Sequence, residues 1–172
     1  YSRLRTDPDK LEFTDVISGS VVTQLISDAQ LRDLSGWYHV VLKVDYTQSS
    51  AADRAKIYLN GSEVSYATST RQSQNGDSFF NSANSHALGT YNDNHYFNGA
   101  MSHVHFTDGY AYDASTFGST DATTGEWKIN TSPSVTYGTN GYFVLKDANG
   151  VTDQSGNSNN FTVGGGTLTN TE

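Results

Sequence analysis

Short segments in which apolar and polar residues alternate recur along this sequence, and Gly, Asn and Asp residues separate them. Alternation with a period of two is typical of a β-strand that has one buried face. The clearest segments are 37–45, 55–59 and 96–106; weaker ones lie in residues 1–25 and in the pair 142–146 and 160–163. The pattern therefore predicts an all-β protein.

The connections between these segments favour antiparallel pairing. Asn60-Gly61 directly follows 55–59, and this dipeptide is the strongest short signal for a hairpin turn. Several short strands joined by such turns predict an antiparallel β-sandwich or jelly roll. Its core is expected from alternate apolar residues, namely Trp37, Val41, Ile57, Leu59, Val104, Phe106, Phe143 and Leu145.

Only two segments look helical. Residues 27–34 (SDAQLRDL) predict one turn capped by Ser27 or Asp28, and residues 109–118 predict a short helix or turn that begins at Asp113. Residues 119–140 are expected to be irregular. The domain is expected to span residues 1–163, and the Gly-rich residues 164–172 are expected to form a flexible tail or linker.

Composition excludes two classes of partner. The formal net charge is −8, and the ten basic residues are scattered, which argues against nucleic acid. No apolar stretch approaches the roughly 20 residues that a membrane span needs, so we expect no membrane insertion. The sequence has no cysteine, which favours synthesis in a reducing cytoplasm followed by assembly or lysis.

Several segments of the sequence carry a resemblance to a known family. WYHVV from Trp37 and RAKIYLNG from Arg54 resemble a hairpin of laminin-G-like, concanavalin A-like lectin/glucanase domains. YFNGAMSHVHFTDG from Tyr96 resembles the strand that follows in that family. DASTFG from Asp113, with YGTNGYF from Tyr137 and DQSGNSNNFT from Asp153, resembles a narrower group in structural proteins of marine tailed phages.

The resemblance covers residues 1 to about 163, and it implies a jelly roll on a virion surface or extracellular appendage. Further strands usually precede the corresponding point in this family. The resemblance therefore implies that the jelly roll lacks its first strands, which are either missing from this fragment or supplied by another chain.

Acidic residues give little support for an enzyme. Glycosidases of this fold use two carboxylates that face one sugar bond, and the resemblance implies two Glu with an Asp between them on one strand. The four glutamates are Glu12, Glu63, Glu126 and Glu172. No two share a predicted strand, and none has an Asp two residues away. The sequence therefore predicts a protein that is not an enzyme.

Metal binding has candidate residues for two ions, zinc and calcium. His103 and His105 share one strand face, and with His95 they could bind zinc, but surface histidines satisfied by their neighbours are the favoured interpretation. Calcium ligands could come from two loops, the first holding Asn92, Asp93 and Asn94, the second holding Asp153 and Asn157. The alternative is that these Asp and Asn side chains bond their own turns.

Glycan binding would use aromatic rings beside Asn-rich and Asp-rich loops. The tyrosines in or next to loops are Tyr91, Tyr96, Tyr110, Tyr112 and Tyr137. Exposed tyrosine equally suits a protein–protein interface, and it is also simply a good strand residue. Asn60, Asn130 and Asn160 begin N-glycosylation patterns, although the turn geometry explains Asn60 better.

These observations predict a module of a tail fibre, spike or head decoration that binds cell-surface glycans weakly in many copies. Its expected partners are other virion or appendage subunits, including copies of itself. A purely structural, self-assembling role in a shell or filament is the alternative, and a glucanase-like glycosidase is disfavoured.

Overall fold

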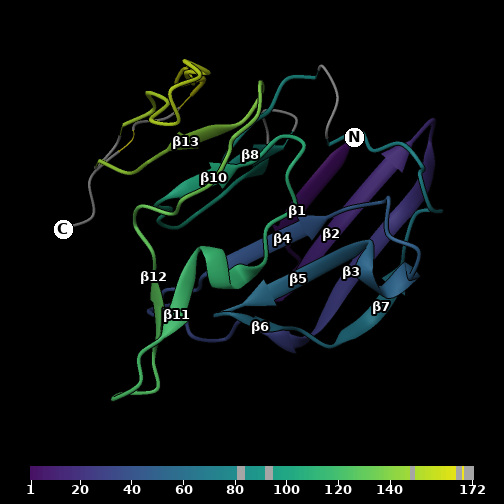
Figure 1. Ribbon diagram of the computed structural model, residues 1–172, viewed down its shortest axis with the longest axis horizontal. Helices are drawn as coiled ribbons and strands as arrows, with labels where there is room; N and C mark the ends of the chain where they lie inside the picture. The colour runs from purple at the N-terminus through teal and green to yellow at the C-terminus, as the bar shows by residue number, and fades with distance from the viewer. Residues whose placement is uncertain (81–83, 92–94, 148–149, 166–167, 169–172) are drawn as a thin grey trace. The chain divides into compact units, whose positions relative to one another are not determined.

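Antiparallel strands form most of the regular structure in the computed structural model, which describes residues 1–80, 84–91, 95–147, 150–165 and 168 (Figure 1). Within these residues the helical segments are two single 3-10 turns, η1 (Ala51–Asp53) and η2 (Ala114–Thr116). The predicted all-β class is confirmed. The chain divides into two compact units: unit 1 is Tyr1–Ser82 with Ala111–Pro133, and unit 2 is Ala83–Tyr110 with Ser134–Glu172.

A four-stranded antiparallel sheet forms one layer of unit 1, in the order β1-β2-β3-β7. The predicted strands in residues 1–25 lie here. Ser18 and Gly19 join β2 to β3 with φ angles of 49° and 81°, which suit a tight hairpin turn. The strands of this sheet are β1 (Ser2–Thr6), β2 (Lys10–Ile17), β3 (Ser20–Gln30) and β7 (Tyr66–Thr70).

A three-stranded sheet forms the second layer, from β4 (Val40–Val44), β5 (Ala55–Leu59) and β6 (Ser62–Glu63). Asn60 and Gly61 connect β5 to β6 with φ angles of 46° and 81°, so the predicted hairpin turn is confirmed. Figure 1 shows β4 and β5 in front of β2 and β3.

The core of unit 1 lies between the two sheets. Phe13 and Leu25 from the first sheet meet Ile57 from the second, and all three are fully buried. The expected core position of Ile57 is therefore confirmed, and Leu59 packs against the same core while partly buried. Phe80 closes the core from a loop by placing its ring edge-on to Phe13, with centroids 6.2 Å apart.

Two other expected core positions are wrong. The residues of β4 that pack on the core are Val40, Leu42 and Val44, because Leu42 pairs with Ile57 across the sheet. Val41 alternates to the opposite face, and Trp37 precedes the strand and is 66% exposed.

The predicted helical turn in residues 27–34 is also wrong. β3 continues to Gln30 and pairs with β2 and β7, so tertiary pairing overrides the local helical pattern. The buried Ser27 has a role there: its hydroxyl accepts a hydrogen bond from the Leu11 amide at 3.0 Å, next to an irregularity in the β2–β3 ladder.

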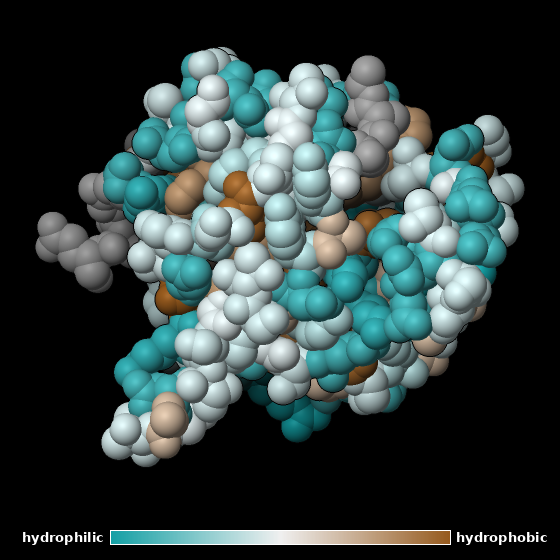
Figure 2. All heavy atoms as spheres, in the orientation of Figure 1, coloured by the Kyte–Doolittle hydropathy of each residue, from teal (hydrophilic) through white to brown (hydrophobic). Residues whose placement is uncertain are grey.

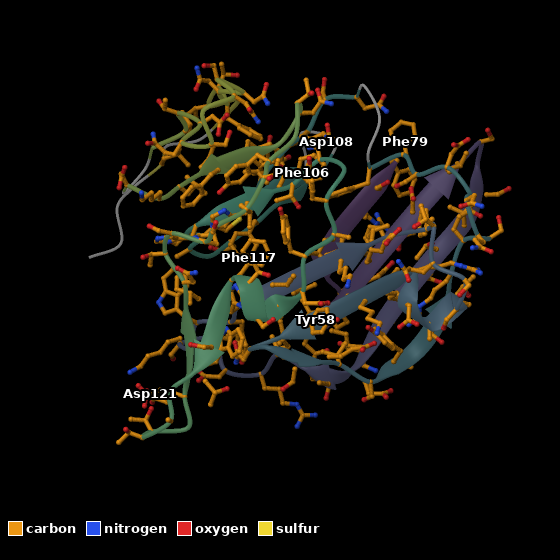
Figure 3. All side chains as sticks on the ribbon, viewed as in Figure 1. Tyr58, Phe79, Phe106, Asp108, Phe117 and Asp121 are labelled. Atoms are coloured by element: carbon orange, nitrogen blue, oxygen red, sulfur yellow. The ribbon has the colours of Figure 1, made fainter. Side chains whose placement is uncertain are left out.

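Residues 111–130 form a 3-10 turn and a projecting hairpin. η2 begins after Asp113, as predicted, but the Asp113 carboxylate makes no cap and instead accepts a hydrogen bond from Lys43 at 2.7 Å. β11 (Gly118–Thr120) and β12 (Trp127–Ile129) then pair where irregular structure was expected. Figure 3 places Phe117 at the start of this hairpin and Asp121 near its tip.

In the described residues of unit 2, the strands form two small antiparallel pairs: β8 (Thr90–Tyr91) with β9 (His95–Tyr96), and β10 (Val104–Phe106) with β13 (Tyr142–Val144). The single strand predicted for 96–106 is therefore interrupted after Tyr96. The strand predicted for 160–163 does not form, although the Phe161 amide donates to the Val151 carbonyl. Phe143 is buried as expected.

Candidate functional site

Among the residues of unit 2 whose exposure the structure describes, the most exposed aromatic side chains lie in the short 96–101 segment. Tyr96 is 67% exposed and Phe97 is 51% exposed, and Asn98 and Met101 are exposed as well. Sugar-binding sites combine aromatic rings with amide groups, because the apolar C–H groups of a sugar stack on an aromatic ring and its hydroxyls form hydrogen bonds with amides. We therefore take the 96–101 segment as the candidate site.

Two glycines shape this segment. The Phe97 amide donates to the Gly89 carbonyl at 2.8 Å, which extends the β8–β9 pairing by one residue. A Cβ on Gly89 would lie 3.2 Å from Met101 Cε, and one on Gly99 would lie 2.8 Å from Phe97 Cζ. Phe97 therefore folds back over Gly99, and Met101 covers Gly89, so both side chains lie against backbone.

The five predicted glycan-binding tyrosines do not form one group. Tyr96 belongs to the 96–101 segment, and Tyr110 is a second exposed ring of unit 2, at 48%. Tyr112 belongs to unit 1, where it packs edge-on to Phe117. Tyr91 is a residue of the short strand β8.

Tyr137 is part of an aromatic stack on β10 and β13. His105 lies flat on Phe143 with centroids 3.9 Å apart, and the His105 Nδ1 atom and the Tyr137 hydroxyl are 2.9 Å apart. Burial raises the Tyr137 pKa to about 12, and the Asp153 charge adds to this effect. His105 thus has a ring partner and a hydrogen-bond partner, as the favoured interpretation of the histidines requires.

His103 lies beside this stack. Its Nδ1 atom is 2.7 Å from the Ser102 hydroxyl, and its ring is tilted against Phe143. Within the residues that the structure describes, no group of three or more His, Cys, Asp or Glu side chains is arranged to hold a metal ion.

The second predicted calcium loop is held together by Asp153. Its carboxylate accepts four hydrogen bonds, from the amides of Phe143, Ser155 and Asn159 and from the Ser155 hydroxyl. Burial acts to raise the Asp153 pKa, but these hydrogen bonds together hold it below its ordinary value. Asp153 therefore organises its own loop.

Two asparagine side chains clamp this loop to residues 138–141. Asn157 donates to the carbonyls of Gly138 and Gly141, at 2.6 and 2.9 Å, and Asn159 donates to those of Thr139 and Gly141. These amide groups donate to carbonyls 16 to 20 residues away, so they join two loops. Asp153 with Ser155 is the pair that bonds within its own turn, as the alternative to calcium binding predicts. Asn92, Asp93 and Asn94, the first predicted calcium loop, lie outside the described residues.

The two acidic residues of β2 face opposite sides of their sheet. Glu12 accepts hydrogen bonds from Arg5 and Thr14, at 2.8 and 2.6 Å, on the outer face. Asp15 is fully buried on the core side, where Ser2, Tyr46 and Ser78 donate to its carboxylate. Two carboxylates placed in this way cannot flank one glycosidic bond.

Sequence reasoning missed several residues with clear roles. Phe97 and Met101 were read as strand residues, yet their exposure marks the 96–101 segment. Trp127 had no predicted role, but its ring covers Gly61 and Gly118, where an added Cβ would lie 2.1 and 2.6 Å from ring carbons. Its position after a turn-rich stretch gave no periodic signal.

A family model described as the concanavalin A-like lectin/glucanases superfamily matches residues 1–116. No curated protein and no solved structure matches the chain. In the part of the chain that the structure describes, no helix is long and apolar enough to cross a membrane.

Proposed function

The chain belongs to the concanavalin A-like lectin/glucanases superfamily, and we propose that it is a non-enzymatic adhesion module that binds glycans weakly and in many copies. Carbohydrate binding or a structural role is what this membership suggests. We place the module on a virion surface or an extracellular appendage, together with other subunits and copies of itself.

The exposure of the 96–101 segment is the observation that carries the glycan-binding part. Burying a large aromatic ring is strongly favourable, so rings that stay in water can gain free energy by covering a ligand. Tyr96 and Phe97 are both more than half exposed. One such segment would bind a sugar weakly, and repetition over many copies would raise the apparent affinity.

The carboxylates support a protein without glycosidase activity. Glu12 is held by Arg5 and Thr14, and Glu63 lies 3.5 Å from Lys56 and accepts from the Tyr66 hydroxyl. A catalytic acid needs a raised pKa and a second carboxylate opposite it. The Glu12 pKa is instead lowered: burial would raise it, but Thr14, Arg5 and Gln24 together outweigh burial.

The virion context rests on the sequence. The absence of cysteine suits assembly in a reducing cytoplasm, and the segments that begin at Asp113, Tyr137 and Asp153 resemble structural proteins of marine tailed phages. Electron microscopy of particles labelled with an antibody against the domain tests this placement. Label on tails or capsids is expected, and unlabelled particles would contradict it.

Glycan binding is tested with a multivalent form of the full chain on a glycan array. We expect binding that falls at least about tenfold in a Tyr96→Ala/Phe97→Ala double variant. Val21→Ala serves as the control, since Val21 is 52% exposed but lies at the start of β3 in unit 1. Equal binding by both variants, or no binding by the unchanged chain, would remove this part of the proposal.

A structural role is the second candidate, and exposed apolar residues of unit 1 favour it. Leu34 is 97% exposed and Trp37 is 66% exposed, both in the loop before β4. Such residues suit a contact with another protein. On the face drawn in Figure 2, hydrophobic residues form small separate patches. A change of Leu34→Ser and Trp37→Ser that abolishes particle assembly would favour this role.

A further inference from the structure

Acidic residues outnumber basic residues in the sequence of unit 2. Its one lysine is Lys146, and its sequence contains no arginine. Its acidic residues are Asp93, Asp108, Asp147, Asp153 and Glu172, so its formal charge is −4 when histidines are neutral.

Lys146 already has a partner. Its ammonium group lies over the Phe143 ring, 5.7 Å from the centroid, which is the geometry of a cation–π contact. The 96–101 segment itself contains no charged residue, only Tyr, Phe, Asn, Gly, Ala and Met. The candidate site therefore offers apolar and amide groups, and it belongs to a unit whose net formal charge is negative.

The cations of unit 1 are also largely engaged. Lys43 pairs with Asp113, Lys56 with Asp53 and Lys128 with Asp121, at 2.5–2.8 Å. Arg54 donates to three backbone carbonyls, those of Gln48, Ser49 and Gln72. These four cations therefore already have carboxylate or carbonyl partners within unit 1.

We infer that the 96–101 segment is selective for uncharged glycans over sulfated or sialylated forms of the same backbone. Recognition of sulfate or carboxylate groups uses Arg or Lys donors, and Lys146 is the only such residue in the sequence of unit 2. A net formal charge of −4 on unit 2 disfavours the approach of an anionic sugar, and salt screens such repulsion beyond roughly 10 Å at ordinary ionic strength. This inference rests on the proposed function, because it names the class of glycan for the same site.

The test uses the multivalent full chain and pairs of glycans that share a backbone: dextran with dextran sulfate, and lactosamine with sialyl-lactosamine. For each pair whose neutral member binds the chain, we expect binding to the charged member to be at least about tenfold weaker at pH 8 and low salt. Raising the salt should narrow this difference by screening the repulsion, and it should leave binding to the neutral member within about twofold.

A variant sharpens the result. Asn98→Lys adds a cation to the exposed 96–101 segment. This variant should reduce the difference in binding between the neutral and the charged glycan of each pair. Asp28→Lys, an exposed change in unit 1, should leave this difference in binding unchanged. Equal or stronger binding to the charged members at low salt would overturn the inference and leave the proposed function standing. Failure of every neutral and charged member to bind would overturn both.

Discussion

Unit 1 and unit 2 are held together in different ways. In unit 1, strands of up to 11 residues pair in two sheets, and fully buried side chains such as Phe13, Leu25 and Ile57 fill the space between these sheets. In unit 2, strands of two or three residues support loops that are fixed by single side chains, chiefly Asp153, Asn157 and Asn159. Unit 1 depends on apolar burial, and unit 2 depends more on hydrogen bonds between loops.

This difference suits a division of roles. Loops that are fixed by hydrogen bonds tolerate changes in exposed residues, because their shape does not depend on a continuous apolar core. The 96–101 segment lies in the unit that is built in this way. The β11–β12 hairpin is intermediate, since it belongs to unit 1 and places one ring, that of Trp127, over Gly61 of the β5–β6 turn.

The largest effect is expected from the core of unit 1. Phe13→Ala removes a fully buried ring between the sheets and should lower the free energy of unfolding by about 4 kcal/mol. Urea denaturation followed by circular dichroism measures this. Val21→Ala, an exposed change at the start of β3, should stay within about 0.5 kcal/mol. A Phe13 variant as stable as the control would show that the two sheets do not depend on this packing.

A smaller effect, confined to unit 2, is expected from Asp153→Ala. The change leaves four donors without their acceptor, and we expect a loss of about 2–3 kcal/mol because the carboxylate is buried. Hydrogen exchange should accelerate at Phe143, Ser155 and Asn159, whose amides bond the carboxylate.

Amides in β2 and β3 serve as the internal control for this prediction and should exchange as before. Asp153→Asn is the matched variant, because it keeps the shape of the side chain and one acceptor oxygen, and it should cost less than Asp153→Ala. If β2 and β3 lose protection equally, the two units unfold together and the contrast between them is wrong.

The two tryptophans offer a matched comparison within unit 1. Trp127 donates through its indole N–H to His39 Nδ1 at 3.0 Å and covers Gly61 and Gly118, whereas Trp37 is exposed. Trp127→Ala should cost about 2 kcal/mol, and Trp37→Ala should cost less than about 0.5 kcal/mol. Thermal denaturation of both variants measures the difference. Equal costs would mean that Trp127 does not hold the hairpin.

The smallest effect is a pH dependence at His39. Burial lowers the His39 pKa from its ordinary value of 6.5, and only the neutral ring can accept the Trp127 hydrogen bond at Nδ1. The resulting stability is fully present above pH 6.5 and is lost as the pH falls through the lowered pKa.

His39→Gln is the comparison for this prediction. The difference in unfolding free energy between the unchanged chain and this variant should shrink from about pH 8 to about pH 5, because the four other histidines are present in both proteins and only His39 differs. A difference that stays constant with pH would show that His39 does not titrate in this contact.

The sequence by itself determined the β class, the hairpin at Asn60-Gly61 and the turn that begins at Asp113, because each depends on neighbouring residues and local backbone preference. It also located the exposed Tyr96 and Tyr110. These features need no knowledge of distant partners.

Tertiary structure alone decided which face of β4 is buried, because residues 37–44 carry apolar side chains on both faces and only the pairing of Leu42 with Ile57 selects one. Tertiary structure also placed Ser27 in a strand, and it placed the Asn157 side chain within hydrogen-bond distance of the Gly138 carbonyl, nineteen residues away. Pairing between distant segments sets these positions, and local periodicity carries no information about such pairing.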